Sequence, residues 1–212
     1  MNQAIIFDFD GTLIDSKKVI YQCFQNITNY LAPERISYAK NILIGPPLRD
    51  TASEILGPNH QGKLDEFVKL FIEVHDENAI NNSHPYPGVV ETLNKLKEKK
   101  VFMAIATNKR QASIIKLINH YKWQDYFNFI ECSDDKKPIR NKDEMIKDIL
   151  NNDKKFNKAF FVGDTPNDGL SANKNNLLFI KANYGYGHTE NWGGIKIFSE
   201  INDIQELMEI YS

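Results

Sequence analysis

The chain has 212 residues, of which 42% are hydrophobic and 25% charged, and its formal net charge is −2. This length predicts one large domain or two small ones, and the composition is ordinary for a globular protein with a sizeable core. Because there is no basic excess, nucleic acid is not expected as the main partner.

Two cysteines, Cys23 and Cys132, are too few for a disulfide framework, and neither has a histidine at metal-binding spacing. The N-terminal residues lack the pattern of a signal peptide, and no apolar run approaches the roughly 18 residues that span a bilayer. We therefore expect a cytoplasmic protein that does not contact membranes. We expect the protein to be a monomer, since no feature of the sequence requires a second copy.

The first predicted strand, Ala4–Phe9, leads into the sequence Asp8-Phe9-Asp10-Gly11. Residues two apart in a strand point the same way, so Asp8 and Asp10 should leave the sheet on one side and repel each other. Mg²⁺ would relieve this repulsion, because it prefers oxygen ligands such as carboxylates. Gly11 permits a tight turn whose amides can face an anion. The alternative is a turn in which aspartate has only a structural role.

A long helical segment follows the first strand. About ninety residues without a convincing strand separate Phe9 from Val101, which is too long for a simple connection. Apolar periodicity predicts helices here, at Ser16–Leu31, Tyr38–Leu43, Leu48–Leu56 and Gly62–Ile80. We expect residues 16–85 to form a helical cap domain inserted into a core of residues 1–15 and 86–212. Turn-forming residues at 14–16 and 84–88 would be its hinges.

The rest of the chain alternates between strand and helix patterns. Such alternation predicts an α/β fold, a Rossmann-like doubly wound parallel sheet whose ligands bind at the carboxyl ends of the strands. The predicted strands are Val101–Ala106, Phe127–Ile130, Ala159–Val162 and Leu177–Ile180. The predicted helices are Gly88–Lys99, Arg110–Tyr121 and Lys142–Leu150.

Two of these later strands end in polar residues suited to the same chemistry. Thr107 and Asn108 follow the second strand and could hydrogen-bond phosphate oxygens, or else cap the next helix. Gly163-Asp164 follows another strand, and Asp168 comes four residues later. A second acidic pair opposite the first would complete a Mg²⁺ site, although a turn with a helix cap is the alternative reading.

A lysine is the fourth element of the expected site. Lys142 opens a predicted helix, with Asn141 as its expected cap, and could neutralise a phosphorylated aspartate at the strand ends.

Taken in order, these motifs resemble the haloacid dehalogenase superfamily of phosphohydrolases. The stretch Asp8-Phe9-Asp10-Gly11-Thr12-Leu13 is the most specific match, and Gly163-Asp164 with Asp168 is a good one. The insert has the position of that superfamily's helical cap. Three further stretches look like its phosphoglycolate-phosphatase-like branch, namely residues 44–48, 86–89 and 141–146. Many members of the superfamily carry the motif lysine in Lys-Pro-x-Pro, which Lys137-Pro138 resembles without the second proline. In the phosphoglycolate-phosphatase-like branch the lysine stands at the helix start, which favours Lys142 over Lys137.

The resemblance implies a Mg²⁺-dependent phosphatase that acts on a small phosphate monoester similar to phosphoglycolate. Asp8 would be the nucleophile that forms an aspartyl-phosphate, and Asp10 the acid and base. Asp10 would contribute to the metal mainly through its carbonyl. The other implied roles are metal binding for Asp8, Asp164 and Asp168, and contacts with the phosphoryl oxygens for Gly11, Thr107, Asn108 and Lys142.

Residues of the cap are harder to assign. Arg49 follows the loop of residues 44–48 and could pair with a carboxylate or second phosphate of the substrate, or be a surface charge. None of the five histidines has ligand spacing, and no role is assigned to them.

Several other functions stay open at this point. A phosphomutase or a nucleoside-monophosphate phosphatase would use the same residues. A non-catalytic phosphate-binding protein is a further alternative. A receiver-type signalling module is disfavoured by the length of the chain and its insert, and a dehalogenase has no need of Asp10 as acid and base.

Overall fold

The computed structural model describes residues 3–136, 138–151, 156–187 and 190–210. Its centre is a six-stranded sheet in the order β5-β4-β1-β6-β7-β8, in which all neighbours are parallel. The strands are β1 (Gln3–Phe7), β4 (Phe102–Thr107), β5 (Phe129–Cys132), β6 (Lys158–Gly163), β7 (Leu178–Ala182) and β8 (Ser199–Ile201).

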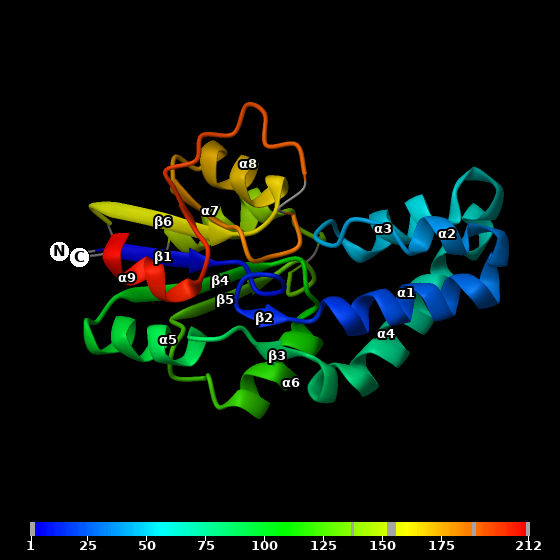
Figure 1. The fold of residues 1–212 in the computed structure, drawn as a ribbon, viewed down its shortest axis with the longest axis horizontal. Coiled ribbons are helices and arrows are strands. Elements are labelled where there is room, and N and C mark those ends of the chain that lie inside the picture. Colours follow the sequence, from blue (N-terminus) through cyan, green and yellow to red (C-terminus); the bar gives the residue numbers. More distant parts are fainter. Residues whose placement is uncertain (1–2, 137, 152–155, 188–189, 211–212) are drawn as a thin grey trace.

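Helices cover both faces of this sheet (Figure 1). Alternate residues of β1 point to opposite faces, so Ile5 and Phe7 join one buried cluster while Ala4 and Ile6 join another. The first cluster is covered by α5 (Val89–Glu98), α6 (Gln111–Tyr121), η3 (Ile204–Glu206) and α9 (Leu207–Ile210). The second is covered by α7 (Lys142–Leu150) and α8 (Pro166–Lys174). This is the predicted doubly wound α/β core.

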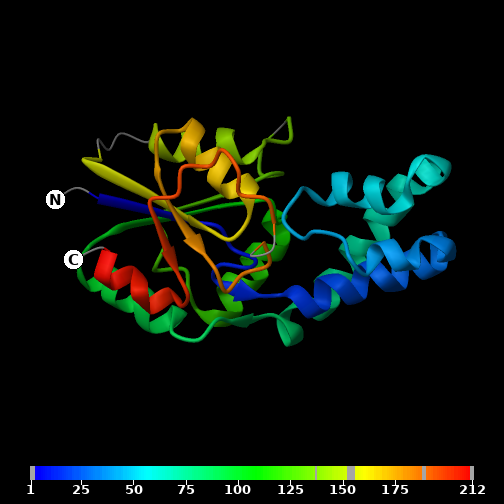
Figure 2. The ribbon, with the colours of Figure 1, turned by 45° about the horizontal axis from the view of Figure 1, so that its top comes forward.

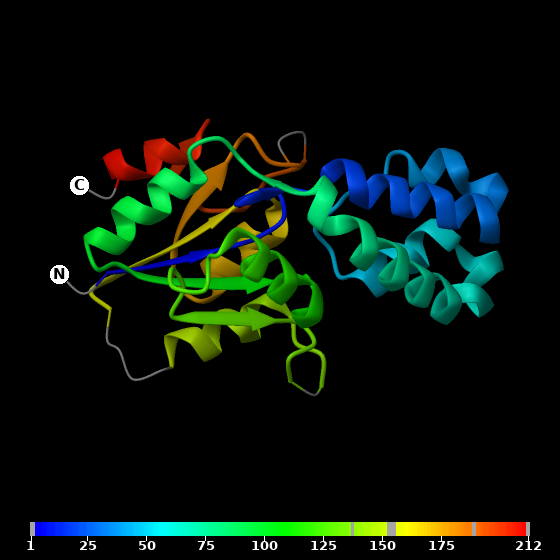
Figure 3. The ribbon, with the colours of Figure 1, turned by 90° about the horizontal axis from the view of Figure 1, so that it is seen from below.

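A bundle of helices extends beyond the carboxyl ends of the strands, away from the chain termini (Figures 1, 2 and 3). It has its own buried cluster, in which Phe24 packs against Phe67 and Phe71. Its helices are α1 (Lys17–Leu31), η1 (Pro33–Arg35), α2 (Ile36–Ala39), α3 (Leu48–Leu56), η2 (Pro58–Lys63) and α4 (Leu64–Asn82).

The chain passes between sheet and bundle twice, and the two passages pair with each other. Strand β2 (Ile14–Asp15) is antiparallel to β3 (His84–Pro85), with Ile14 opposite Pro85 and Asp15 opposite His84. Both lie in the segments expected as hinges. The prediction of no strand in this part of the chain was wrong for these four residues, because a pair this short leaves no apolar alternation in the sequence.

Other differences from the predicted elements are shifts of a few residues. The strand expected at Phe127–Ile130 begins at Phe129, because both the backbone and the side chain of Asn128 bond to the backbone of Met103. The helix expected at Tyr38–Leu43 begins and ends earlier, at Ile36 and Ala39. Strand β8 was missed, since it has only three residues.

None of the helices in the described part of the chain combines the length and the apolar character that a membrane crossing requires.

The packing predicts a large difference between two isoleucines. Ile105 is fully buried in β4, whereas Ile115 on α6 is 45% exposed. We expect Ile105→Ala to lower the free energy of unfolding by about 2–5 kcal/mol, since it leaves a cavity in the core. The matched control Ile115→Ala should change it by less than about 0.5 kcal/mol. Denaturant unfolding measures both, and equal effects would contradict this account of the core.

Candidate active site

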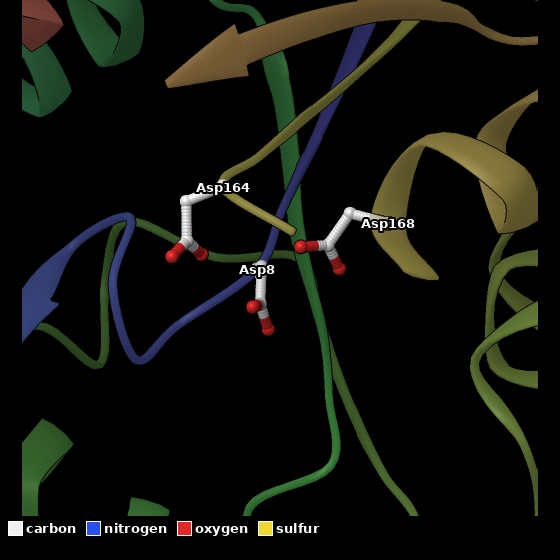
Figure 4. A group of neighbouring side chains, drawn as sticks. All are labelled: Asp8, Asp164 and Asp168. Atoms are coloured by element: carbon white, nitrogen blue, oxygen red, sulfur yellow. The ribbon is translucent and has the colours of Figure 1, made fainter. Parts of the chain in front are cut away.

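Three buried carboxylates meet at the carboxyl edge of the sheet (Figure 4). Asp8, Asp164 and Asp168 each place an oxygen within 4.8 Å of the others. Asp8 follows β1 and Asp164 follows β6, which are parallel neighbours with Phe7 opposite Val162. Their carboxyl ends therefore coincide. This is also where the strand order reverses, the place at which open α/β sheets bind ligands.

Asp168 is fixed by the start of α8. Thr165 is the N-cap residue, and its backbone amide and hydroxyl donate to Asp168 Oδ2 at 2.9 and 2.7 Å. This reciprocal capping box turns Asp168 inward, and it leaves Oδ1 to face the other carboxylates. The sequence suggested either a turn with a helix cap or an acidic metal site at these residues, and the structure shows that the same residues form both the cap and the acidic group.

Lys142 is the cation of this group. It is the first residue of α7, where Asn141 and Glu144 form a capping box, as the sequence predicted for the cap. Its ammonium lies 2.9 Å from Asp8 Oδ1 and 2.5 Å from Asp168 Oδ1, and its side chain is only 2% exposed. The alternative candidate, Lys137, lies outside the described residues.

The electrostatics of the group fit a bound divalent cation. Three carboxylates and one ammonium leave two uncompensated negative charges in a buried site. Burial raises the pKa of Asp8 to about 7 and that of Asp164 well above its usual value, because neither charge is fully balanced. Lys142 opposes the rise at Asp8, and its own pKa is raised by Asp168 and Asp8. Carboxylate oxygens are the donors that hard divalent cations prefer.

The turn at Gly11 is packed against Asp164. Thr12 Oγ1 donates to Asp164 Oδ1 at 3.3 Å, and the amide of Tyr186 donates to Oδ2 at 2.7 Å. Gly11 has φ +87°, and a Cβ atom there would lie 2.3 Å from Asp164 Oδ2. Glycine is required at this position both by the backbone conformation and by the space available.

Asp10 lies apart from the three carboxylates and has different partners. Ser16 Oγ donates to it at 2.6 Å, and Lys109 Nζ lies 3.1 Å from both of its carboxylate oxygens. Its carboxylate is therefore not a member of the metal-ligand group. The expected metal contact through the carbonyl oxygen of Asp10 stays a prediction.

Thr107 and Asn108 do not cap the next helix, since the N-cap position of α6 is Arg110. Thr107 Oγ1 accepts from the amide of Lys109 at 3.1 Å. The side-chain amide of Asn108 donates to the carbonyl of Gly45 at 2.8 Å, so it joins the sheet to the loop that precedes α3. Both residues line the cavity described next.

A cavity of about 730 Å³, its open mouth included, separates the sheet edge from the helical bundle. Its sheet side holds Asp8, Asp10, Lys109 and Lys142 in addition to Thr107 and Asn108.

Arg49, expected as a possible substrate contact, does not line this cavity. It pairs with Asp65 at 2.8 Å, and its side chain is 56% exposed, so the structure agrees with the surface-charge alternative.

Lys109, His75 and Tyr186 are among the residues of the site that were not predicted. Lys109 could have been noticed, since it directly follows Thr107-Asn108. His75 lines the cavity from α4, and Tyr186 bonds through its hydroxyl to Ser16 and through its amide to Asp164. No sequence signal marks His75 or Tyr186. The packing of α4 places His75 at the cavity, and a loop 170 residues from Ser16 places Tyr186 at the site.

Comparisons with known proteins identify the family of this chain. A family model for haloacid dehalogenase-like hydrolases matches residues 5–182. A phosphoglycolate phosphatase of Aquifex aeolicus is 30% identical over 209 residues, which cover 95% of this chain and 90% of that protein. The pyrophosphatase PpaX of Halalkalibacterium halodurans is 27% identical over 171 residues, covering 80% of this chain and 78% of the other.

Solved structures share the fold over the whole chain. A predicted phosphatase from Clostridium acetobutylicum superposes with a TM-score of 0.86 at 24% identity, covering 100% of this chain and 98% of the other. A predicted phosphoglycolate phosphatase from Haemophilus somnus gives 0.84 at 21% identity, with coverage of 99% and 97%.

The chain therefore belongs to the haloacid dehalogenase-like hydrolase family, as its motifs indicated. The prediction of an enzyme of the phosphoric monoester hydrolase class is confirmed by this membership together with relatives that are named phosphatases.

The packing at Gly11 predicts a severe effect of a single added methyl group. Gly11→Ala should lower phosphatase activity at least about a hundredfold, because the Cβ atom would displace Asp164 and the backbone would be strained. Gly62→Ala is the control, since a Cβ atom there meets no atom within 4 Å. Steady-state hydrolysis of p-nitrophenyl phosphate measures both. Normal turnover by Gly11→Ala would disprove the tight packing.

Proposed function

We propose that this protein is a Mg²⁺-dependent phosphatase that hydrolyses a small phosphate monoester through an aspartyl-phosphate on Asp8. One observation carries the proposal: Lys142 holds the Asp8 carboxylate beside Asp164 and Asp168 at the sheet end of the cavity. In this proposal residues 16–85 are the cap that encloses the substrate.

Asp8 is the nucleophile. One of its carboxylate oxygens attacks phosphorus, the bond to the ester oxygen breaks, and the phosphoryl group passes to Asp8. Asp8 and Asp164 would hold Mg²⁺, which would supply positive charge to the phosphoryl oxygens and orient the ester. Asp168 supports the site by binding Lys142, and the ammonium of Lys142 acts to lower the pKa of Asp8 against the larger effect of burial.

Asp10 transfers the protons. It protonates the departing alkoxide, and then it removes a proton from the water that attacks the aspartyl-phosphate, so the carboxyl group returns to its starting state. Ser16 and Lys109 orient its carboxylate toward the cavity that Asp8 also lines. For both steps, protonation of the alkoxide and deprotonation of the water, Asp10 must lie on the side of phosphorus opposite to Asp8.

Lys142 and the hydroxyl of Thr107 would contact the transferring oxygens. The backbone amide of Gly11, expected in the same role, donates instead to the carbonyl of Ile14 at 2.8 Å, and Gly11 does not line the cavity. Asn108 holds the loop at Gly45 over the site, which favours exclusion of bulk water. Phosphatase relatives, among them phosphoglycolate phosphatases and pyrophosphatases, support the reaction class.

Replacing the nucleophile tests the mechanism. Asp8→Asn should lower the turnover of p-nitrophenyl phosphate in Mg²⁺ by at least about 10³-fold, because an amide cannot form the covalent intermediate. The exposed Asp125, changed to Asn, removes the same charge elsewhere and should leave turnover unchanged. If Asp8→Asn keeps more than about a tenth of the activity, Asp8 is not the nucleophile.

Metal binding can be tested without turnover. Mg²⁺ at about a hundred times its Kd should raise the melting temperature by roughly 5–10 °C, and Asp164→Asn should abolish most of this rise. Burial raises the pKa of Asp8 to about 7 and raises that of Asp164, so protons compete with the ion at lower pH.

The sign of the pH effect follows from these pKa values. In the metal-free protein, the raised pKa of Asp8 favours the fold at low pH, and this contribution is lost as the pH rises through about 7. Stabilisation by Mg²⁺ should therefore be larger at pH 8 than at pH 5.5, as measured by differential scanning calorimetry. An equal rise in wild type and Asp164→Asn would rule out this metal site.

A further inference from the structure

The cavity has two unlike walls. The sheet side carries the charged groups of the reaction, whereas the wall that the helical bundle contributes is mainly apolar. The bundle's apolar contributors include Ile20, Phe24, Ile44, Leu48, Phe71 and Ile72. The phosphate of an ester would occupy the charged side, so its alcohol portion would face this apolar wall.

The bundle offers no cation to that alcohol portion. Among the described residues that line the cavity, none of those from α1 to α4 is lysine or arginine. Arg49, the cation of the bundle that the sequence suggested as a substrate contact, pairs with Asp65 instead. An anionic group on the alcohol would lose water here without gaining a partner of opposite charge, which is costly.

The cations of the sheet side are already engaged. Lys142 pairs with Asp8 and Asp168, and Lys109 pairs with Asp10. In the proposed reaction Lys142 serves the reacting phosphate, and Lys109 orients the acid Asp10. Neither is available to a second anionic group of the substrate.

Arg110 is the residue of the cavity that could best bind a second anionic group of a substrate. Its Nη1 is buried without a hydrogen bond, and it lies in the cavity lining. However, Nη1 is 3.5 Å from Asp76 Oδ2, and Nε is 3.6 Å from Asp134 Oδ2. Asp76 also lines the cavity, so a carboxylate that approached Arg110 would meet this negative charge.

His75 supplies a neutral polar group on the apolar wall. Its ring stacks on Phe71 with centroids 5.3 Å apart. Burial and the nearby Lys109 lower its pKa to about 4, although Asp10 and Asp76 act in the opposite direction. The imidazole is therefore neutral at pH 7, where it can hydrogen-bond an uncharged group but cannot form an ion pair with an anion.

We propose that the substrate is the phosphate monoester of an uncharged, partly apolar alcohol, which packs against Phe71 and Ile72 and can reach His75. This inference rests on the proposed phosphatase function and narrows its substrate class. It separates this chain from an enzyme for phosphoglycolate or pyrophosphate, the compounds in the names of its relatives, since both carry a second anionic group next to the reacting phosphate.

A matched pair of esters tests the proposal. Isobutyl phosphate and phosphoglycolate have the same branched shape next to the ester oxygen, but one ends in two methyl groups and the other in a carboxylate. We expect kcat/KM in Mg²⁺ to be at least about tenfold higher for isobutyl phosphate. Equal or faster hydrolysis of phosphoglycolate would overturn the inference while leaving the phosphatase function intact. Failure to hydrolyse either ester or p-nitrophenyl phosphate would overturn both.

Variants locate the contact. Ile72→Ala should lower the ratio of kcat/KM for isobutyl phosphate to that for methyl phosphate about tenfold, because methyl phosphate cannot reach the apolar wall. Leu70→Ala, on the same helix but outside the cavity lining, should leave the ratio unchanged. Equal changes in the two variants would contradict the assigned contact.

Arg110→Gln tests the rival explanation. We expect this variant to keep the preference for isobutyl phosphate over phosphoglycolate. A selective loss of phosphoglycolate hydrolysis, with the neutral esters unaffected, would identify Arg110 as a carboxylate receptor and would overturn the proposal.

Discussion

The burial of three carboxylates around a single lysine is the constraint on which the site depends. Asp8, Asp164 and Asp168 repel one another at the sheet edge, and Lys142 neutralises only part of their charge. The surrounding structure must hold them against this repulsion. It does so with neighbouring parallel strands, a capping box at Thr165 and a glycine turn packed against Asp164. A site built in this way favours the arrival of positive charge, whether as a divalent ion or as a proton.

The groups of the proposed reaction and the apolar wall of the cavity belong to different parts of the molecule. Every charged group of the proposed reaction belongs to the sheet core or to the segments that follow its strands, whereas the apolar wall of the cavity comes from the helical bundle. The same division explains how members of one family can act on different compounds, since the bundle can change its cavity residues without moving Asp8 or Asp164. Family membership thus fixes the reaction more firmly than it fixes the substrate.

The sequence predicted the parts of the site that secondary structure alone determines. The strand-end positions of Asp8 and Asp164 followed from the apolar runs before them, whereas the pairing of their two strands is known only from the sheet order. Lys142 was preferred because it opens a helix, as the lysine does in the branch that the motifs resemble. Residues placed by tertiary packing were not predictable. The position of His75 depends on the rotation of α4, and that of Tyr186 on the path of a loop. Arg49 had the expected chemistry, but its helix turns it toward Asp65. Strands of two or three residues left no periodic pattern to detect.

The short ribbon between β2 and β3 has a mechanical consequence. Because Ile14 pairs with Pro85 and Asp15 with His84, the two connections to the helical bundle are tied to each other rather than being separate tethers. A displacement of one of these strands would therefore move the other with it. Ser16, which directly follows this ribbon, donates to Asp10, so the same displacement would also move the hydrogen-bond partner of the proposed acid and base.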